Sequence, residues 1–200
     1  MKKILLAMVG VIALTAGSTQ LALAADDAAI VAESSAILKK DPKNLEARIK
    51  RADASVNLGD FTSAIADYDL LVVQDPTSMT YFKRGNAYMR RGEAEGNSRD
   101  YDSSIEDFGK SIELDGSNAY AFYFRGNLMI KRGKKAEGIA DFDEAIMRNG
   151  TNDWFYYTRG QAHFDNGDYR EAANDWEQAR KLGFDSSVVD PKIAEAKSKM

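Results

Sequence analysis

The sequence predicts an all-α solenoid built from helix pairs, and three observations support this fold class. A small residue recurs at one register position with spacings of 33, 41 and 34 residues, at Ala52, Gly85, Gly126 and Gly160. A glycine follows each of them seven residues later, and a large aromatic residue recurs in the second half of each unit. Self-similarity at a period of about 20–50 residues is the signature of repeat architectures.

The first 24 residues differ from the rest of the chain and have the pattern of a signal peptide. Lys2 and Lys3 form a short positive region, residues 4–16 are apolar, and a run of small residues ends at Ala24. The apolar run is shorter than the roughly 20 residues that a membrane-spanning helix needs. We therefore expect cleavage after Ala24, with an uncleaved N-terminal anchor as the alternative. Export predicts a periplasmic or secreted protein with no stable membrane insertion after cleavage.

Composition and charge exclude several functional classes. The chain has no cysteine, so neither a disulfide framework nor thiolate chemistry is expected. Without residues 1–24 the net charge is −6, which disfavours nucleic acid, because affinity for phosphates depends on Lys and Arg. His163 is the only histidine and cannot form an ordinary zinc site by itself. No phosphate-binding loop or nucleophile elbow is present, so we expect a structural His163, no metal, no cofactor and no enzyme activity.

Each unit is expected to contain two antiparallel helices. The recurring glycines lie in the middle of the first helix, where glycine costs about 1 kcal/mol relative to alanine, so they imply a close approach of the second helix. The later glycines are expected to end the first helices in a left-handed conformation; they are Gly59, Gly92, Gly133 and Gly167. In the second helix a small residue precedes a large aromatic one by four positions, which lets the helices interlock. These pairs are Ala64 and Tyr68, Ser104 and Phe108, Gly138 and Phe142, and Ala172 and Trp176.

The period and these residues together resemble the tetratricopeptide repeat (TPR) family, whose unit is a pair of antiparallel helices. The resemblance implies a right-handed superhelix of four repeats, at residues 45–77, 78–118, 119–152 and 153–184. The second repeat carries seven extra residues within 93–100, which would form either one more turn in each helix or a polar loop.

Single helices are expected to cap both ends of the solenoid. The N-terminal capping helix is expected within residues 25–44 and the C-terminal one within 185–200. The second of these is expected over Asp190 to Met200, with Pro191 in its first turn. Terminal units with a polar outer face are what a solenoid requires.

Arginine and aspartate also recur in register, one in each first helix and one in each second helix. An active site needs one asymmetric constellation, whereas this feature occurs once in every repeat. We therefore interpret it as a set of structural ion pairs that fix the helix register: Arg51 with Asp67, Arg84 with Asp107, Arg125 with Asp141, and Arg159 with Asp175.

The resemblance further implies that one face of the first helices lines a concave groove. The residues expected to bind a partner there are Phe82, Asn86, Met89, Tyr120, Tyr123, Asn127, Ile130, Trp154, Tyr157, Gln161 and Phe164. Exposed aromatic residues in this number are unusual on a surface with nothing to bind, and side-chain amides can pair with a peptide backbone. The alternative is that the chain's own terminal helices fill the groove.

These observations predict a protein–protein interaction adaptor of the bacterial cell envelope. Its partner would be a protein or peptide with apolar side chains, because aromatic residues occupy the column where a carboxylate clamp of this family would need lysine. Two alternatives stay open at this point. One is a structural protein that self-associates into a homo-oligomer, and the other is a glycan-binding accessory of cell-wall enzymes.

Cleavage of the signal peptide can be tested directly. We expect Ala25 to be the first residue of the exported protein, because Ala22 and Ala24 offer small side chains to both pockets of signal peptidase. N-terminal sequencing of the exported material measures this. Recovery of an intact Met1 in the membrane fraction would instead identify an anchored protein.

Overall fold

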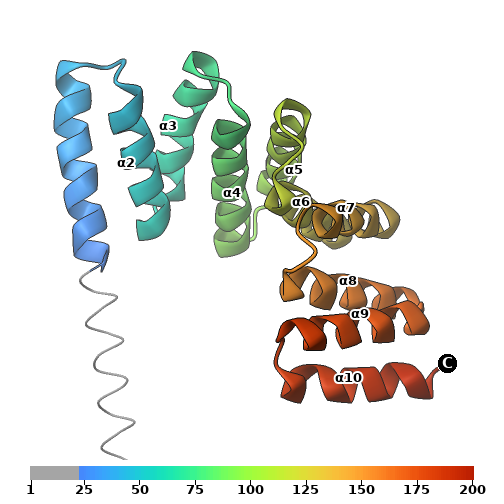
Figure 1. Ribbon diagram of the computed structural model, residues 1–200. Helices are drawn as coiled ribbons and strands as arrows, with labels where there is room; N and C mark the ends of the chain where they lie inside the picture. The colour runs from blue at the N-terminus through green and yellow to red at the C-terminus, as the bar shows by residue number, and fades with distance from the viewer. Residues whose placement is uncertain (1–22) are drawn as a thin grey trace, which may run out of the picture.

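The protein is a curved stack of α-helices in the computed structural model, which describes residues 23–200 (Figure 1). A helix over residues 23–40 comes first, and four antiparallel pairs and a last single helix follow. The pairs and the last helix are α2 (Leu45–Leu58), α3 (Phe61–Gln74), α4 (Ser78–Glu95), α5 (Ser98–Leu114), α6 (Ala119–Lys131), α7 (Lys135–Arg148), α8 (Asp153–Asn166), α9 (Tyr169–Leu182) and α10 (Ser186–Ser198). Neighbours in the chain are neighbours in space, as in a TPR solenoid.

The expected signal peptide, residues 1–24, lies outside the described residues except for positions 23 and 24, which belong to the N-terminal helix. Within the described part of the chain, no helix has the length and apolarity needed to cross a membrane. Export and cleavage therefore stay predictions.

Local sequence signals explain where the helices begin and end. The first helices start after a residue whose side chain accepts a hydrogen bond from a free backbone N–H of the first turn; these residues are Asn44, Thr77, Asn118 and Asn152. Gly59 and Gly167 follow α2 and α8 with φ of 80° and 91°, a left-handed conformation that favours glycine. The loops are short as a result, and each pair is held antiparallel.

The centre of each pair is a contact between a small residue and a large aromatic ring. Tyr68, Phe108, Phe142 and Trp176 are almost fully buried at this contact. At Gly126 the helices are so close that a Cβ would lie 2.9 Å from both the Gly138 carbonyl oxygen and the Phe142 ring. The close approach inferred from the mid-helix glycines is confirmed.

The expectation for Gly92 is wrong. Gly92 does not end the first helix of the second repeat, because α4 continues to Glu95 and Gly96 takes the left-handed conformation at φ 69°. Gly92 is instead buried against Tyr101, whose ring would lie 2.8 Å from an added Cβ. The seven extra residues form helix: α4 has 18 residues and α5 has 17, compared with 14 in both α2 and α3.

The C-terminal capping helix also begins earlier than expected. α10 starts at Ser186, because the Asp185 side chain accepts a hydrogen bond from the Ser187 backbone N–H over 2.8 Å. Pro191 consequently lies inside the helix and not in its first turn. The helix packs on α9 through Val189 and Ile193, which are buried in the last core cluster.

Two glycine substitutions in helix interiors should have opposite effects. Gly126→Ala should lower the free energy of unfolding by about 1–3 kcal/mol, because the added methyl group meets backbone and a packed ring. Gly109→Ala should raise it by about 0.5–1 kcal/mol, because the nearest atom is 3.7 Å away and alanine favours a helix. Urea unfolding of both variants measures the difference, and a stabilised Gly126→Ala would contradict the close approach.

Candidate functional site

Arginine–aspartate pairs join the two helices of every repeat. In each pair, Nε and Nη2 of the arginine donate to the two carboxylate oxygens over 2.6–2.9 Å. The hydrogen bonds to Asp141 hold the pKa of Arg125 above its usual value, so this guanidinium stays charged. All four expected pairs are present: Arg51 with Asp67, Arg84 with Asp107, Arg125 with Asp141, and Arg159 with Asp175. Their recurrence in every repeat favours a structural role.

Two of these arginines also reach the preceding repeat. Arg84 Nη1 donates to Asp69 on α3 over 2.9 Å, and Arg159 Nη1 donates to Asp143 on α7 over 2.6 Å. Each acceptor follows the paired aspartate of its own repeat by two residues, a spacing that could have revealed it in the sequence. The second repeat has Gly109 at this place, so the link is not formed between the second and third repeats.

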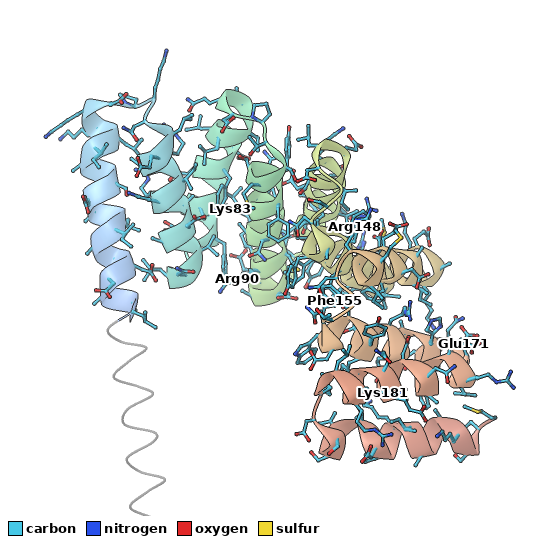
Figure 2. All side chains as sticks on the ribbon, in the orientation of Figure 1. Lys83, Arg90, Arg148, Phe155, Glu171 and Lys181 are labelled. Atoms are coloured by element: carbon cyan, nitrogen blue, oxygen red, sulfur yellow. The ribbon has the colours of Figure 1, made fainter. Side chains whose placement is uncertain are left out.

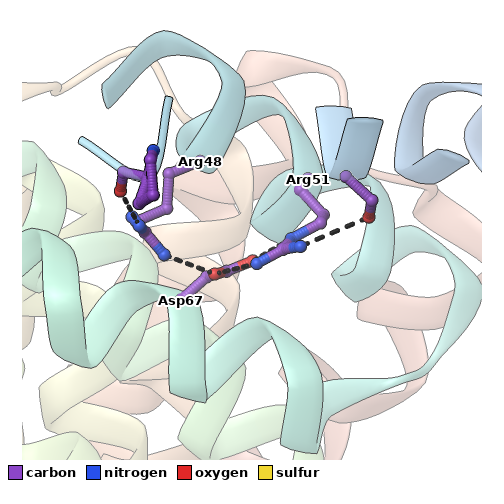
Figure 3. Close-up of polar contacts among 5 residues, drawn as sticks. Arg48, Arg51 and Asp67 are labelled. Atoms are coloured by element: carbon purple, nitrogen blue, oxygen red, sulfur yellow. Dashed lines mark hydrogen bonds and ion pairs between the residues drawn. The ribbon is translucent and has the colours of Figure 1, made fainter. Parts of the chain in front are cut away.

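The first repeat uses the same aspartate to hold the N-terminal cap. Asp67 accepts hydrogen bonds from both Arg48, over 3.1 Å, and Arg51, over 2.7 Å (Figure 3). Arg51 Nη1 also donates to Ser35 Oγ on the N-terminal helix over 3.2 Å, and Arg48 Nη2 donates to the Pro42 carbonyl. A buried carboxylate thus fixes the cap to the first helix pair.

The lengthened second repeat carries an additional pair that the sequence analysis missed. Arg91 donates to both oxygens of Asp100 over 2.7 and 2.8 Å, and Asp100 is buried. Arg91 lies seven residues after Arg84, and Asp100 lies seven residues before Asp107. The ion pair and the adjacent glycine–aromatic contact are therefore duplicated about two helical turns along the pair.

A groove formed by three pockets runs along the N-terminal helix, α2, α4 and α6. The first pocket, of about 430 Å³, lies between the N-terminal helix and α2. The second, of about 320 Å³, lies between α2 and α4 and shares Asp53 and Asn57 with the first. The third, of about 570 Å³, lies between α4 and α6. We call these three pockets together the N-terminal groove.

Polar and charged side chains link α2 to α4 in the second pocket. Tyr68 donates from its hydroxyl to Asp53, and Lys83 Nζ forms an ion pair with the other oxygen of Asp53. Burial raises the pKa of Tyr68, and the hydrogen bond to Asp53 raises it further, so the hydroxyl remains a donor. Figure 2 shows Lys83 and Arg90 on the side of α4 that faces α2 and α3, and Arg90 lies over the Phe61 ring.

Six of the residues expected to bind a partner line this groove. Phe82 and Asn86 line the second pocket, and the third is lined by Met89, Tyr123, Asn127 and Ile130. Tyr123 also stacks on Phe155 of α8, with ring centroids 4.9 Å apart, so it contributes to the contact between repeats as well. Tyr120 and Trp154 are about half exposed at the edge of the solenoid.

The other three expected residues contact the C-terminal part of the chain. The Tyr157 ring stacks on Phe184 with centroids 4.3 Å apart. Gln161 accepts a hydrogen bond from Lys192 over 2.7 Å, and the Lys199 ammonium lies over the Phe164 ring. These contacts bring the C-terminal part of the chain against this end of the expected surface, where the three residues stay partly exposed. Partner binding by these three residues stays a prediction.

The N-terminal helix and the extra turn of α4 also line the groove, which was not expected from the repeat pattern. Asp27, Ile30, Glu33 and Ile37 line the first pocket, and Glu93 lines the third. The spacing of seven between Ile30 and Ile37 could have indicated one shared face. Because Glu93 lies in the extra segment of the second repeat, the longer helix pair adds a wall to the largest pocket.

The described residues contain no group of three or more potential metal ligands. His163 lies at the end of α8, where its Nδ1 is 3.5 Å from Asp168 Oδ2 and its carbonyl accepts a hydrogen bond from the backbone of the following turn. This position fits the structural role expected for His163.

The fold and the groove define a helix-pair repeat protein, a class of scaffold that is typically non-catalytic. Models of the tetratricopeptide repeat match residues 35–78, 82–153 and 154–184, so the chain belongs to the tetratricopeptide repeat family. Proteins of this family generally mediate protein–protein interactions. No curated protein matches the chain.

Solved structures of TPR proteins share this fold. MamA is 22% identical, with a TM-score of 0.70 over 85% of this chain and 90% of that one. YrrB, described as a TPR protein with an unusual peptide-binding site, is 15% identical, with a TM-score of 0.69 over 82% of each chain. The first TPR domain of Spaghetti (RPAP3), bound to an HSP90 peptide, is 21% identical, with a TM-score of 0.54 over 62% of this chain and 92% of that one. At these identities the likeness shows the fold alone.

The register pairs should be energetically coupled. We expect Arg125→Ala and Asp141→Ala each to lower the free energy of unfolding, and the double-mutant cycle to give a coupling of about 1–3 kcal/mol, because the pair is bidentate and its carboxylate is buried. The same cycle on the exposed pair Lys110 and Glu113 should give about 0.5 kcal/mol or less. Strict additivity at Arg125 and Asp141 would contradict the proposed role.

Proposed function

We propose that this chain is a protein–protein interaction adaptor of the bacterial cell envelope that holds a peptide segment of its partner in the N-terminal groove. The groove itself carries the proposal: three adjoining pockets follow three first helices and the N-terminal helix. Pockets in a row suit an extended chain, whose side chains can enter successive pockets. The signal-like pattern of residues 1–24 supports a location in the periplasm or outside the cell.

The third pocket is best suited to hold an apolar side chain. Met89 and Ile130 form its sides, and Phe124 and Leu128 contribute further apolar surface. Glu93 and Lys131 lie at the same pocket and offer charges of both signs to a peptide backbone or its ends. Most of the binding energy of such an interface usually comes from a few apolar anchors in well-formed pockets, so this pocket is the expected anchor site.

Two alternative functions remain. A glycan-binding surface would use free aromatic faces. Tyr123 and Tyr157 each have one face stacked on a ring of the same chain, and Tyr120 and Trp154 are the aromatic residues that remain about half exposed. A self-associating protein would need a self-complementary surface, and the oligomeric state in solution, measured by light scattering, separates this alternative from the adaptor.

A charge placed in the third pocket should remove the partner. Cross-linking in the bacterial envelope fraction, followed by mass spectrometry, identifies the proteins that the chain captures. Met89→Asp should reduce this capture at least about tenfold, because burying an apolar anchor against a carboxylate is unfavourable.

Met147→Asp is the matched control, because Met147 is 70% exposed on α7 and lines none of the three pockets. Both variants should keep their helical content and melting temperature. Equal capture by Met89→Asp and Met147→Asp would place the binding surface outside the N-terminal groove.

A further inference from the structure

The pocket between the N-terminal helix and α2 combines apolar walls with carboxylates. Ile30 and Ile37 of the N-terminal helix and Ala54 of α2 provide the apolar surface. Asp27 and Glu33, each about one helical turn from Ile30 on the same helix, lie at the same pocket. The cavity of about 430 Å³ is large enough for a long side chain.

Most of the other charges around this pocket are already paired. Lys50 lines the pocket, but its ammonium is 2.7 Å from Glu46. Asp53 is paired with Lys83 of α4 and accepts a hydrogen bond from a tyrosine hydroxyl.

Two acidic side chains remain available. Asp27 accepts a hydrogen bond from the neutral amide of Asn57 over 3.2 Å, and no ion pair within residues 23–200 involves Asp27 or Glu33. Within the described part of the chain these two carboxylates form no ion pair, although Lys50 also experiences the charge of Glu33. The lining of the pocket therefore keeps an excess of negative charge.

We propose that this pocket receives a lysine or arginine side chain of the bound peptide, an inference that rests on the peptide-binding function proposed above. The methylene groups of such a side chain would lie along Ile30, Ile37 and Ala54, while its charged end reaches Asp27 and Glu33. Charge complementarity selects this occupant, because an acidic side chain would meet two like charges and an apolar one would offer neither carboxylate an opposite charge.

The order of the three pockets also predicts how the bound peptide lies along the groove. The first and second pockets share Asp53 and Asn57, and the second and third are both lined by α4. The peptide therefore carries a basic residue at one end and an apolar residue for the α4–α6 pocket at the other. Its backbone lies across α2 and α4.

Selection of phage-displayed random 12-residue peptides on the purified protein tests both the proposed groove function and the preference for a basic residue. The inference predicts enriched peptides with one apolar position and one Lys or Arg position at a constant separation. Asp27→Asn combined with Glu33→Gln should remove the preference for Lys or Arg and keep the preference for the apolar residue. The amide oxygen introduced by Asp27→Asn would still accept the hydrogen bond from Asn57, so the variant should fold.

The affinity of one selected peptide, labelled with fluorescein, shows how much its basic residue contributes to binding. Replacing its basic residue with norleucine should weaken binding to the unmodified protein about fivefold or more, and raised salt should reduce that difference. The double variant should bind both peptides equally. Glu137→Gln combined with Glu171→Gln removes the same charge at exposed sites on α7 and α9 and should leave the preference intact.

The outcomes separate the two proposals. Enrichment of an apolar position without Lys or Arg would overturn this inference and leave the groove function standing. Absence of any enriched peptide would overturn the groove function as well. If light scattering instead shows a dimer that Asp27→Asn with Glu33→Gln dissociates, the occupant is a second copy of this chain and the inference fails.

Discussion

The close approach of two helices at one small residue is the constraint on which the rest of this structure depends. At Gly126 the helices leave no room for a Cβ, and a large ring from α7 closes the contact. The bidentate pair between Arg125 and Asp141 lies directly beside it, so translation and rotation of the two helices are both fixed. Because the two helices of each repeat are held this closely, the first helices can form one face, and the pockets of the N-terminal groove lie along it.

The periodic part of the fold could be predicted from the sequence, because the two helices of every repeat pack through the same contact, a small residue against a large aromatic ring. The ion pairs, the buried aromatic residues and the close contacts all follow from that periodicity. Gly92 departs from this periodicity: the same residue type at the same spacing has a different role because Tyr101 lies opposite to it. The contacts at the C-terminal end were harder to predict, since Phe184 and Lys192 contact α8 through tertiary packing that no repeat pattern records.

The two capping helices have different consequences for the candidate site. α10 contacts the first helix of the fourth repeat, where Tyr157 and Phe164 pack against the last core cluster and Lys192 donates to Gln161. The N-terminal helix leaves a cavity against α2 and adds acidic side chains to its wall. The three pockets of the N-terminal groove therefore all lie between the N-terminal helix and α6. A sequence pattern that treats all four repeats alike cannot show this difference.

The duplicated pair in α4 and α5 also limits how this protein could change in length during evolution. Arg91 and Asp100 repeat the geometry of Arg84 and Asp107 because each lies seven residues, about two turns, from its counterpart on the same helix and so returns to the same face. An insertion of two or five residues in one helix would rotate the end of that helix, so that its charged residue would no longer face its partner on the other helix. A helix hairpin of this kind keeps such pairs when it lengthens by whole turns taken in both arms at once, and here the longer α4 also contributes Glu93 to the pocket beside α6.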